Sequence, residues 1–266
     1  MGDGLTTMGQ VFAEAYRLRL MRGLEDALGD LGMLKIAGVD EAGRGCLAGP
    51  VVAGAVLVEP GKLVPGVDDS KGLSALQRER LADAIRRAHP VSAVVAVPAA
   101  TIDRINILQA TRLAMREAVA RLSPQPDMTL IDAVRLSLPT PSLAVVRGDQ
   151  ISYAVACASI LAKVERDHLM ARLDRDFPHY AFADNKGYGS AVHREALAAF
   201  GPCGVHRLTF RSVLPKLETP SRTKRSGRAG QANAAKPKRS ARSRSRAASR
   251  ADSSVPSHAI TSVGGA

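Results

Sequence analysis

The sequence predicts an α/β fold in which helices flank a mixed central sheet. Short apolar and β-branched runs alternate with longer segments of helical spacing. Several acidic residues come directly after predicted strand ends, where α/β folds tend to place ligands. With 266 residues, of which 45% are hydrophobic, the chain can bury a substantial core in one or two domains.

The first predicted element is a helix within an N-terminal extension, residues 1–33. Its apolar series at i, i+4 spacing comprises Phe12, Tyr16, Leu20, Leu24 and Leu28. This spacing favours a paired or packed helix outside the catalytic core. Strands at 34–40 and 50–58 follow, and then a loop at 59–72. Ser74 is predicted to cap a helix at 75–88, with Gln77 at the capping-box position.

The rest of the predicted catalytic domain, residues 34–217, continues the alternation. Its remaining elements are a strand at 91–97, a helix at 101–122, strands at 128–131 and 143–146, a long helix at 151–176, and a helix at about 190–200. The last helix belongs to a small helical C-terminal part.

A basic tail, residues 218–266, differs in composition from the rest. From Thr219 onward it holds eleven Lys or Arg and one acid, so it carries nearly all of the net charge of +12. Such a segment cannot bury enough apolar area to fold, and it is predicted to be disordered. It either raises salt-sensitive affinity for nucleic acid or is a solvated extension, and truncation after Leu217 separates these possibilities.

Other classes of protein are disfavoured by composition. No apolar run reaches the roughly 18–20 residues of a membrane span, and the N-terminus lacks a signal pattern. We therefore expect a cytoplasmic protein without a membrane partner. The three cysteines, Cys46, Cys157 and Cys203, are expected to be reduced thiols.

Four acids are the candidate catalytic residues: Asp40, Glu41, Asp132 and Asp149. Adjacent carboxylates repel each other near a core, and a divalent cation is the usual reason to assemble them. Mg²⁺ and Mn²⁺ prefer carboxylate oxygens, and two-metal phosphodiester cleavage needs several of them to converge. Any one of these acids could instead be a turn residue or a helix cap, and Asp149 in particular fits an N-cap.

A series of motifs occurs in a set order: DEAGRG at 40–45, DSKGLS at 69–74, INILQAT at 105–111, LID at 130–132, GD at 148–149, ASILAKVERD at 158–167 and NKGYGS at 185–190. The series resembles that of ribonuclease HII, a type 2 RNase H, over roughly residues 34 to 214. The resemblance implies an RNase H-like core and a metal-dependent endoribonuclease. Its substrates would be RNA/DNA hybrids and duplex DNA with embedded ribonucleotides, incised on the 5′ side to leave 3′-OH and 5′-phosphate ends. A monomer is expected.

The resemblance also assigns roles to residues. Asp40, Glu41, Asp132 and Asp149 match the family's metal-binding and catalytic quartet. Gly43, Arg44 and Gly45 match the loop that recognises the ribonucleotide, and Tyr188 matches the tyrosine that packs against a sugar. A ribose is distinguished by its 2′-hydroxyl, which the backbone of a glycine-rich turn can approach closely. Lys163, and with less support Lys71, could contact phosphates.

Three positions depart from the family pattern. Ala133 stands where Gly or Asn is usual, Asn185 where His is frequent, and Cys157 where Ala is most frequent. None of them removes a quartet carboxylate. His193 and His206 fit no standard zinc spacing, and Asp167 is interpreted as a salt-bridge residue.

Two alternatives compete with a ribonuclease. One is a non-enzymatic binding protein that holds nucleic acid through the basic tail, but a mere binder gains nothing from four carboxylates near phosphates. The other is a different two-metal nuclease or phosphoesterase, which leaves GRG and NKGYGS unexplained. The sequence does not decide the preferred metal, the balance between the two substrates, or the roles of the tail and the N-terminal extension.

Overall fold

The fold is taken from a computed structural model, which describes residues 2–68, 70 and 72–214. The tail predicted to be disordered, 218–266, lies outside the described residues, as does Lys71. No helix in the described part of the chain is both long enough and apolar enough to cross a membrane.

The centre of the fold is a five-stranded mixed sheet in the order β3-β2-β1-β4-β5. The strands are β1 (Ile36–Ala42), β2 (Val51–Val58), β3 (Ser92–Val97), β4 (Met128–Asp132) and β5 (Ser142–Val145). The β1–β2 and β2–β3 pairs are antiparallel, whereas β1–β4 and β4–β5 are parallel. The predicted α/β class with a mixed sheet is confirmed, and each predicted strand is found within two residues of its expected bounds.

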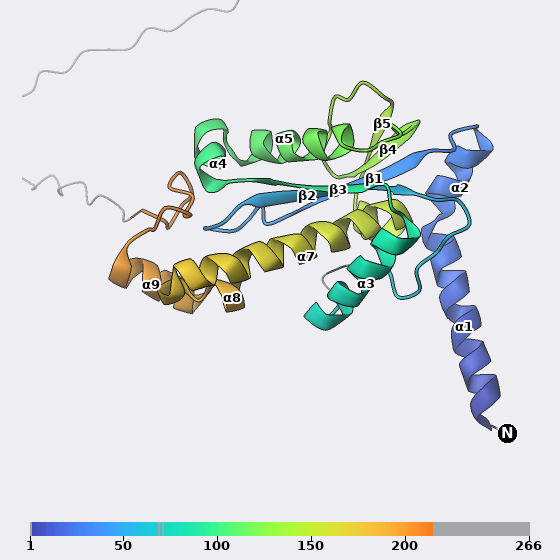
Figure 1. Cartoon of the computed structure of the whole chain (residues 1–266), viewed down its shortest axis with the longest axis horizontal. Helices are drawn as coiled ribbons and strands as arrows, with labels where there is room; N and C mark the ends of the chain where they lie inside the picture. Colours follow the sequence, from blue (N-terminus) through green and yellow to red (C-terminus); the bar gives the residue numbers. More distant parts are fainter. Residues whose placement is uncertain (1, 69, 71, 215–266) are drawn as a thin grey trace, which may run out of the picture. The chain divides into compact units, whose positions relative to one another are not determined.

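Helices cover both faces of this sheet (Figure 1). On one face, α4 (Ala99–Ile105) and α5 (Ile107–Ala120) pack against inward side chains such as Val39 and Ile131. On the other face, α7 (Tyr153–Asp176) packs against β2, and α3 (Ala75–Ala88) packs against α7. The predicted capping box of α3 is present, with Ser74 and Gln77 bonded reciprocally.

The long helix α7 packs very close to the sheet because glycines face it. A Cβ added to Gly38 in β1 would lie 2.0 Å from the carbonyl carbon of Ala154, and one added to Gly54 in β2 would lie 2.4 Å from the carbonyl oxygen of Ala158. Both distances are far below ordinary contact, so only glycine fits. This close packing brings the polar side chains of α7 to the acids of β1.

One predicted helix is interrupted, and another begins two residues later than expected. The helix predicted at 101–122 breaks at Asn106, which has a φ of 65° and caps α5 by accepting from the Gln109 N–H at 3.1 Å. This positive φ, combined with a ψ of 164°, is unfavourable for a residue with a side chain, and the cap that Asn106 supplies compensates for it. The helix predicted at 151–176 is preceded by the short α6 (Gly148–Ile151) and begins at Tyr153, because Ser152 caps it.

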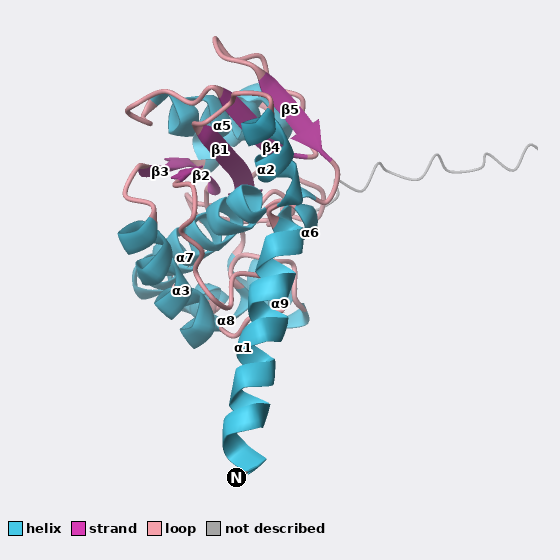
Figure 2. Ribbon diagram, turned by 90° about the vertical axis from the view of Figure 1, so that its right-hand side faces the viewer, coloured by secondary structure: helices cyan, strands magenta, loops and turns pink. Residues whose placement is uncertain are grey.

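The N-terminal extension forms α1 (Gly2–Met21) and α2 (Gly23–Asp30). The predicted apolar series is packed only in part: Leu24 and Leu28 pack in a core cluster, whereas Phe12, Tyr16 and Leu20 are exposed. The buried apolar residues of α1 are instead Leu18 and Met21, which lie where the helix reaches the core. Figure 2 shows the N-terminal half of α1 leading away from the sheet, which explains why the apolar series there is not covered.

The extension also holds the start of α7 through a buried carboxyl group. Glu25 of α2 is 1% exposed and accepts from the Ser152 hydroxyl at 2.6 Å and from the Ala154 N–H at 2.8 Å. Burial raises the pKa of Glu25. The extension thus contacts the junction between α6 and α7, three residues after Asp149.

The C-terminal part of the described chain is helical, as predicted. It consists of a 3₁₀ turn (Pro178–Tyr180), α8 (Phe182–Asn185), α9 (Ala191–Phe200) and an irregular segment to residue 214. A small cluster around Tyr180 and Phe182 packs it against the end of α7.

Candidate active site

Three of the predicted acids converge at one edge of the sheet because β1 and β4 are parallel neighbours. Val39 lies opposite Ile131, so the next residues of the two strands are Asp40 and Asp132. The charge of Asp132 acts on both Asp40 and Glu41. The register of the sheet therefore assembles carboxylates that are 92 positions apart in sequence.

Asp40 is one of the two buried aspartates of the group. Its side chain is 5% exposed, accepts from the Glu41 N–H at 2.7 Å, and is hydrogen-bonded to the Ser159 hydroxyl of α7. The Ser70 hydroxyl lies 3.0 Å from that of Ser159 and continues the chain of hydrogen bonds. Burial, and then the charges of Glu41 and Asp132, hold the pKa of Asp40 well above its usual range.

Glu41 forms one ion pair in the part of the chain that the structure describes, with Arg44. Burial raises its pKa, whereas an ion pair with Arg44 at 3.2 Å acts in the opposite direction. Its Oε2 atom is buried without a hydrogen-bond partner in the described residues. An unsatisfied buried carboxylate oxygen beside a second carboxylate is a costly arrangement unless a cation is bound.

The Asp132 carboxylate bonds to Gly148, the residue before Asp149. The Gly148 N–H donates to Oδ1 of Asp132 at 2.7 Å, which brings the following residue, Asp149, to the same edge of the sheet. Asp149 is 5% exposed and lies in the first turn of α6. It is not an N-cap, because Arg147 occupies that position and Ser152 caps α7.

The chemistry of this donor set fits a divalent cation. The described residues contain no group of three or more His, Cys, Asp or Glu side chains already arranged to hold a metal ion. Nevertheless, Asp40, Glu41 and Asp132 repel one another, and one buried oxygen of Glu41 lacks a partner. Hard cations prefer such oxygen ligands and would relieve this repulsion.

The Gly43–Gly45 turn directly follows β1. Gly43 is buried with a φ of 90°, and an added Cβ would lie 1.9 Å from Nε of Arg166, so the position requires glycine. Arg44 and Gly45 are exposed. The turn thus has a buried first residue and two residues that a ligand can reach.

Arg166 connects this region to the loop that carries Tyr188. Its buried guanidinium donates to the carbonyl oxygens of Pro50 at 3.1 Å, Ala48 at 3.3 Å and Lys186 at 2.8 Å. The guanidinium carbon also lies 6.0 Å from the centre of the Tyr188 ring, which is 48% exposed. Tyr188 is therefore held near the turn with half of its surface free.

The Asn185 side chain shapes the same loop. It donates to the Tyr180 carbonyl at 2.6 Å and accepts from the Gly187 N–H at 2.8 Å. Gly187 in turn accepts from the Leu47 N–H at 2.8 Å. Asparagine can thus perform a structural role at this position, where the family pattern frequently has histidine.

A buried pair of histidines that sequence reasoning did not connect with Tyr188 supports its backbone. The Cys203 N–H donates to Nδ1 of His206, so Nε2 of His206 carries its proton and donates to Nε2 of His193 at 3.0 Å. Nδ1 of His193 then donates to the Tyr188 carbonyl at 2.8 Å. Both rings are neutral in this arrangement, and burial lowers both pKa values, that of His206 to about 4.

Lys163 lies on α7, one turn after Ser159, and forms an ion pair within the same helix. Its ammonium group pairs with Asp167 at 2.6 Å, and Asp167 also pairs with Arg78 at 3.3 Å. Asp167 thus forms salt bridges, in agreement with its interpretation from the sequence.

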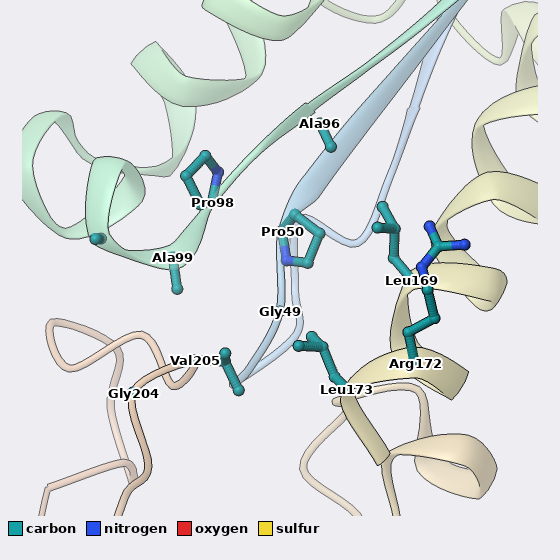
Figure 3. A pocket seen from close by; sticks show the side chains of 11 residues that line it. Gly49, Pro50, Ala96, Pro98, Ala99, Leu169, Arg172, Leu173, Gly204 and Val205 are labelled. Carbon is teal, nitrogen blue, oxygen red and sulfur yellow. The ribbon is translucent and has the colours of Figure 1, made fainter. Parts of the chain in front are cut away.

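An apolar cavity of about 360 Å³ lies at Gly49 and Pro50, and none of the four acids lines it. Figure 3 shows it between Pro50, Ala99, Leu173 and Val205. With so few polar groups in its lining, this cavity does not suit a phosphate or a metal ion. The carboxylate edge is the better candidate for catalysis.

Comparison with known proteins agrees with this geometry. The ribonuclease HII family model matches residues 37–213. The ribonuclease HII of Syntrophotalea carbinolica is 50% identical over 190 residues, covering 71% of this chain and 91% of the relative. That of Geobacter metallireducens is 52% identical over 183 residues, covering 68% and 86%.

Solved structures give the same assignment. The crystal structure of ribonuclease H2 from Pyrococcus horikoshii has a TM-score of 0.59 and 25% identity, covering 67% of this chain and 95% of that one. A structure of the PCNA:RNase HII complex from Archaeoglobus fulgidus includes a chain with a TM-score of 0.59 and 29% identity, covering 69% and 98%. The chain therefore belongs to the ribonuclease HII family and is a hydrolase of the ribonuclease H type.

Proposed function

We propose that this chain is an endonuclease that hydrolyses the RNA strand of RNA/DNA hybrids and incises 5′ of ribonucleotides embedded in duplex DNA, leaving 3′-OH and 5′-phosphate ends. The observation that carries the proposal is the convergence of Asp40, Glu41 and Asp132 at one sheet edge, next to the Gly43–Gly45 turn. Carboxylates serve phosphodiester hydrolysis, and the exposed residues of the turn, Arg44 and Gly45, can approach a sugar closely.

The carboxylates would hold divalent cations, Mg²⁺ or Mn²⁺, with Asp149 as the fourth ligand in a two-metal-ion mechanism. When bound, such ions supply Lewis-acid activation of a water and neutralise charge on the scissile phosphate. The chain's own contribution is orientation. Ser159 fixes the Asp40 carboxyl group, and the Gly148 N–H fixes that of Asp132.

Recognition of the substrate is assigned to the neighbouring surface. The backbone of the Gly43–Gly45 turn would contact the 2′-hydroxyl, and the half-exposed ring of Tyr188 would pack against the adjoining sugar. Lys163 would contact a phosphate. Because Lys163 already pairs with Asp167, a phosphate would compete with that carboxylate. The contribution of Lys163 to substrate affinity should therefore be smaller than that of an unpaired lysine.

The proposal is tested with a labelled DNA duplex that carries one ribonucleotide, an all-DNA duplex of the same sequence, and an RNA/DNA hybrid, each with Mg²⁺ or Mn²⁺. We expect incision of the hybrid and incision 5′ of the single ribonucleotide, with no incision of all-DNA duplex and no reaction in the presence of a chelator. Asp132→Asn should abolish cleavage. Asp83→Asn, which removes an exposed carboxylate of α3, is the matched control and should cleave normally.

A failure of the wild-type chain to incise either ribonucleotide substrate, or incision by Asp132→Asn at the wild-type rate, would contradict the proposal. Tight binding of the substrates without any cleavage under these conditions would favour the alternative of a non-enzymatic binding protein.

A further inference from the structure

Arg207 is a completely buried arginine whose donors are directed at the loop after β1. Within the described residues it forms no ion pair; its guanidinium donates to three backbone carbonyl oxygens instead. Nε contacts Gly49 at 3.0 Å, Nη1 contacts Arg44 at 2.9 Å and Nη2 contacts Gly43 at 2.7 Å. A guanidinium has a rigid fork of donors, so three simultaneous bonds fix the positions of these carbonyls relative to one another.

The backbone of Arg207 is itself anchored. Its N–H donates to the Leu47 carbonyl at 2.8 Å, and the Val205 carbonyl accepts from the Gly49 N–H at 2.9 Å. Figure 3 shows Val205 near Gly49 at the rim of the apolar cavity. On the other side of Arg207, the carboxylate of Asp103 in α4 accepts from the N–H groups of the next two residues at 2.9 and 3.0 Å.

The orientation of these carbonyls determines where the N–H groups of the turn point. A trans peptide is planar, and its C=O and N–H bonds point in opposite directions. The Gly43 and Arg44 carbonyls point at Arg207, so the N–H groups of Arg44 and Gly45 point away from it. Neither N–H has a hydrogen-bond partner among the residues that the structure describes, and both residues are exposed.

We propose that Arg207 is a positioning residue for ribose selection: by holding the Gly43 and Arg44 carbonyls, it presents the Arg44 and Gly45 N–H groups to the 2′-hydroxyl of the substrate. This inference rests on the proposed function. It places the determinant of sugar specificity 163 positions from the turn it controls.

Burial lowers the pKa of Arg207 to about 10, so the guanidinium stays protonated at neutral pH. Its carbon lies 5.1 Å from the centre of the Phe210 ring, a contact that replaces some of the lost hydration. A lysine at this position would keep the charge, but its single ammonium group could not span three carbonyls.

The test compares Arg207→Met and Arg207→Lys with a matched control, Arg211→Met, which removes an exposed positive charge from the same segment. Two quantities are measured with Mg²⁺ or Mn²⁺: kcat/KM for the duplex with one ribonucleotide, and the Ki of the all-DNA duplex as a competitive inhibitor. The first depends on the ribose contact, whereas the second depends on general binding of the duplex.

We expect Arg207→Met to lower kcat/KM by about 10- to 100-fold, the range typical of misplacing a reacting partner by up to 1 Å. The Ki of the all-DNA duplex should stay within about twofold of the wild-type value, because that duplex has no 2′-hydroxyl to lose. The kcat/KM of Arg207→Lys should remain at least about fivefold below that of wild type. The control, Arg211→Met, should have the kcat/KM and the Ki of wild type. If Arg207→Met does not fold, Arg207→Lys carries the test on the same two quantities.

Wild-type kcat/KM in Arg207→Lys would overturn the inference, because the fork of donors would then be unnecessary. Parallel losses of kcat/KM and of affinity for the all-DNA duplex would also overturn it, because they would indicate only a structural role. If wild type itself does not incise the ribonucleotide-containing duplex, it is the proposed function that has failed.

Discussion

Replacing Gly38 with alanine tests whether the close contact between β1 and α7 builds the carboxylate site. Gly38 lies two residues before Asp40, and Ala154, its neighbour in α7, lies five residues before Ser159. A Cβ at this position would be 2.0 Å from one backbone atom of Ala154 and 2.1 Å from another, whereas real Cβ contacts essentially never fall below 3.0 Å. The strand and the helix must therefore separate by about 1 Å.

The size of the effect follows from this displacement. Overpacking a core typically costs 1–3 kcal/mol, and we expect about 3 kcal/mol because backbone rather than a flexible side chain must move. For a domain of this size, that loss corresponds to a decrease in Tm of about 10 °C. The same shift would stretch the hydrogen bond between Ser159 and Asp40, and misplacing a reacting group by 1 Å can lower activity about 100-fold.

The assay combines urea unfolding of the metal-free protein with kcat/KM on the single-ribonucleotide duplex. Gly9→Ala is the control, because an added Cβ at Gly9 in α1 meets nothing within 4 Å. That variant should be more stable by roughly 0.5–1 kcal/mol, since alanine favours a helix over glycine. If Gly38→Ala unfolds within about 0.5 kcal/mol of wild type and cleaves at its rate, the reasoning about this contact is refuted.

Four further predictions concern single groups. Asp40→Asn should abolish cleavage yet raise the Tm of the metal-free protein, because burial and the neighbouring carboxylates raise the pKa of this carboxyl group and so disfavour its ionised form at neutral pH. A lower Tm in metal-free buffer would contradict this. Ala133→Gly should raise the free energy of unfolding in urea by about 1 kcal/mol, because Ala133 has a φ of 47°, which glycine adopts more readily than alanine. An unchanged urea midpoint would show that the turn is not strained. Glu25→Ala should lower the free energy of unfolding by about 2 kcal/mol, because it leaves two buried donors unpaired. Glu25→Gln should retain most of the stability, and equal losses in the two variants would exclude the hydrogen bonds as the cause. His206 has a pKa of about 4 in the fold and 6.5 when unfolded, so the unfolded chain binds more protons between these pH values. The Tm should therefore decrease as the pH is lowered from 6.5 to 4, and His206→Gln should show a smaller decrease. Identical pH profiles of the two proteins would rule out His206 as the group responsible.

Most of the fold follows from local patterns in the sequence. The apolar runs predicted the bounds of each strand to within two residues, and Ser74 and Gln77 alone predicted the capping box of α3. Both features depend on residues that are neighbours along the chain. The break at Asn106 was not predicted, because asparagine is compatible with a helix and no neighbouring residue in the sequence signals the positive φ that it adopts in the fold. The apolar series of the N-terminal extension is packed only at Leu24 and Leu28, because periodicity indicates which residues share a face but not which surface covers them.

The candidate site divides in the same way. The motif order pointed to the four acids, the Gly43–Gly45 turn and Tyr188, and their roles as ligands and sugar contacts remain predictions. No signal in the sequence linked Arg207 to the turn, because its three acceptors are backbone carbonyls, which carry no residue identity. The same limit hid the contact from His193 to the Tyr188 carbonyl.

The sequence by itself determined which groups this chain has for its chemistry: paired carboxylates at the end of a strand, a glycine turn after them, and the motif series of the ribonuclease HII family. The tertiary structure decided how those groups meet. The parallel register of β1 and β4 places Asp132 beside Asp40, and Gly38 allows α7 to approach closely enough for Ser159 to bond Asp40. Strand register, helix approach and bonds to backbone carbonyls depend on packing between distant segments, whereas a local sequence pattern reports only on neighbours along the chain.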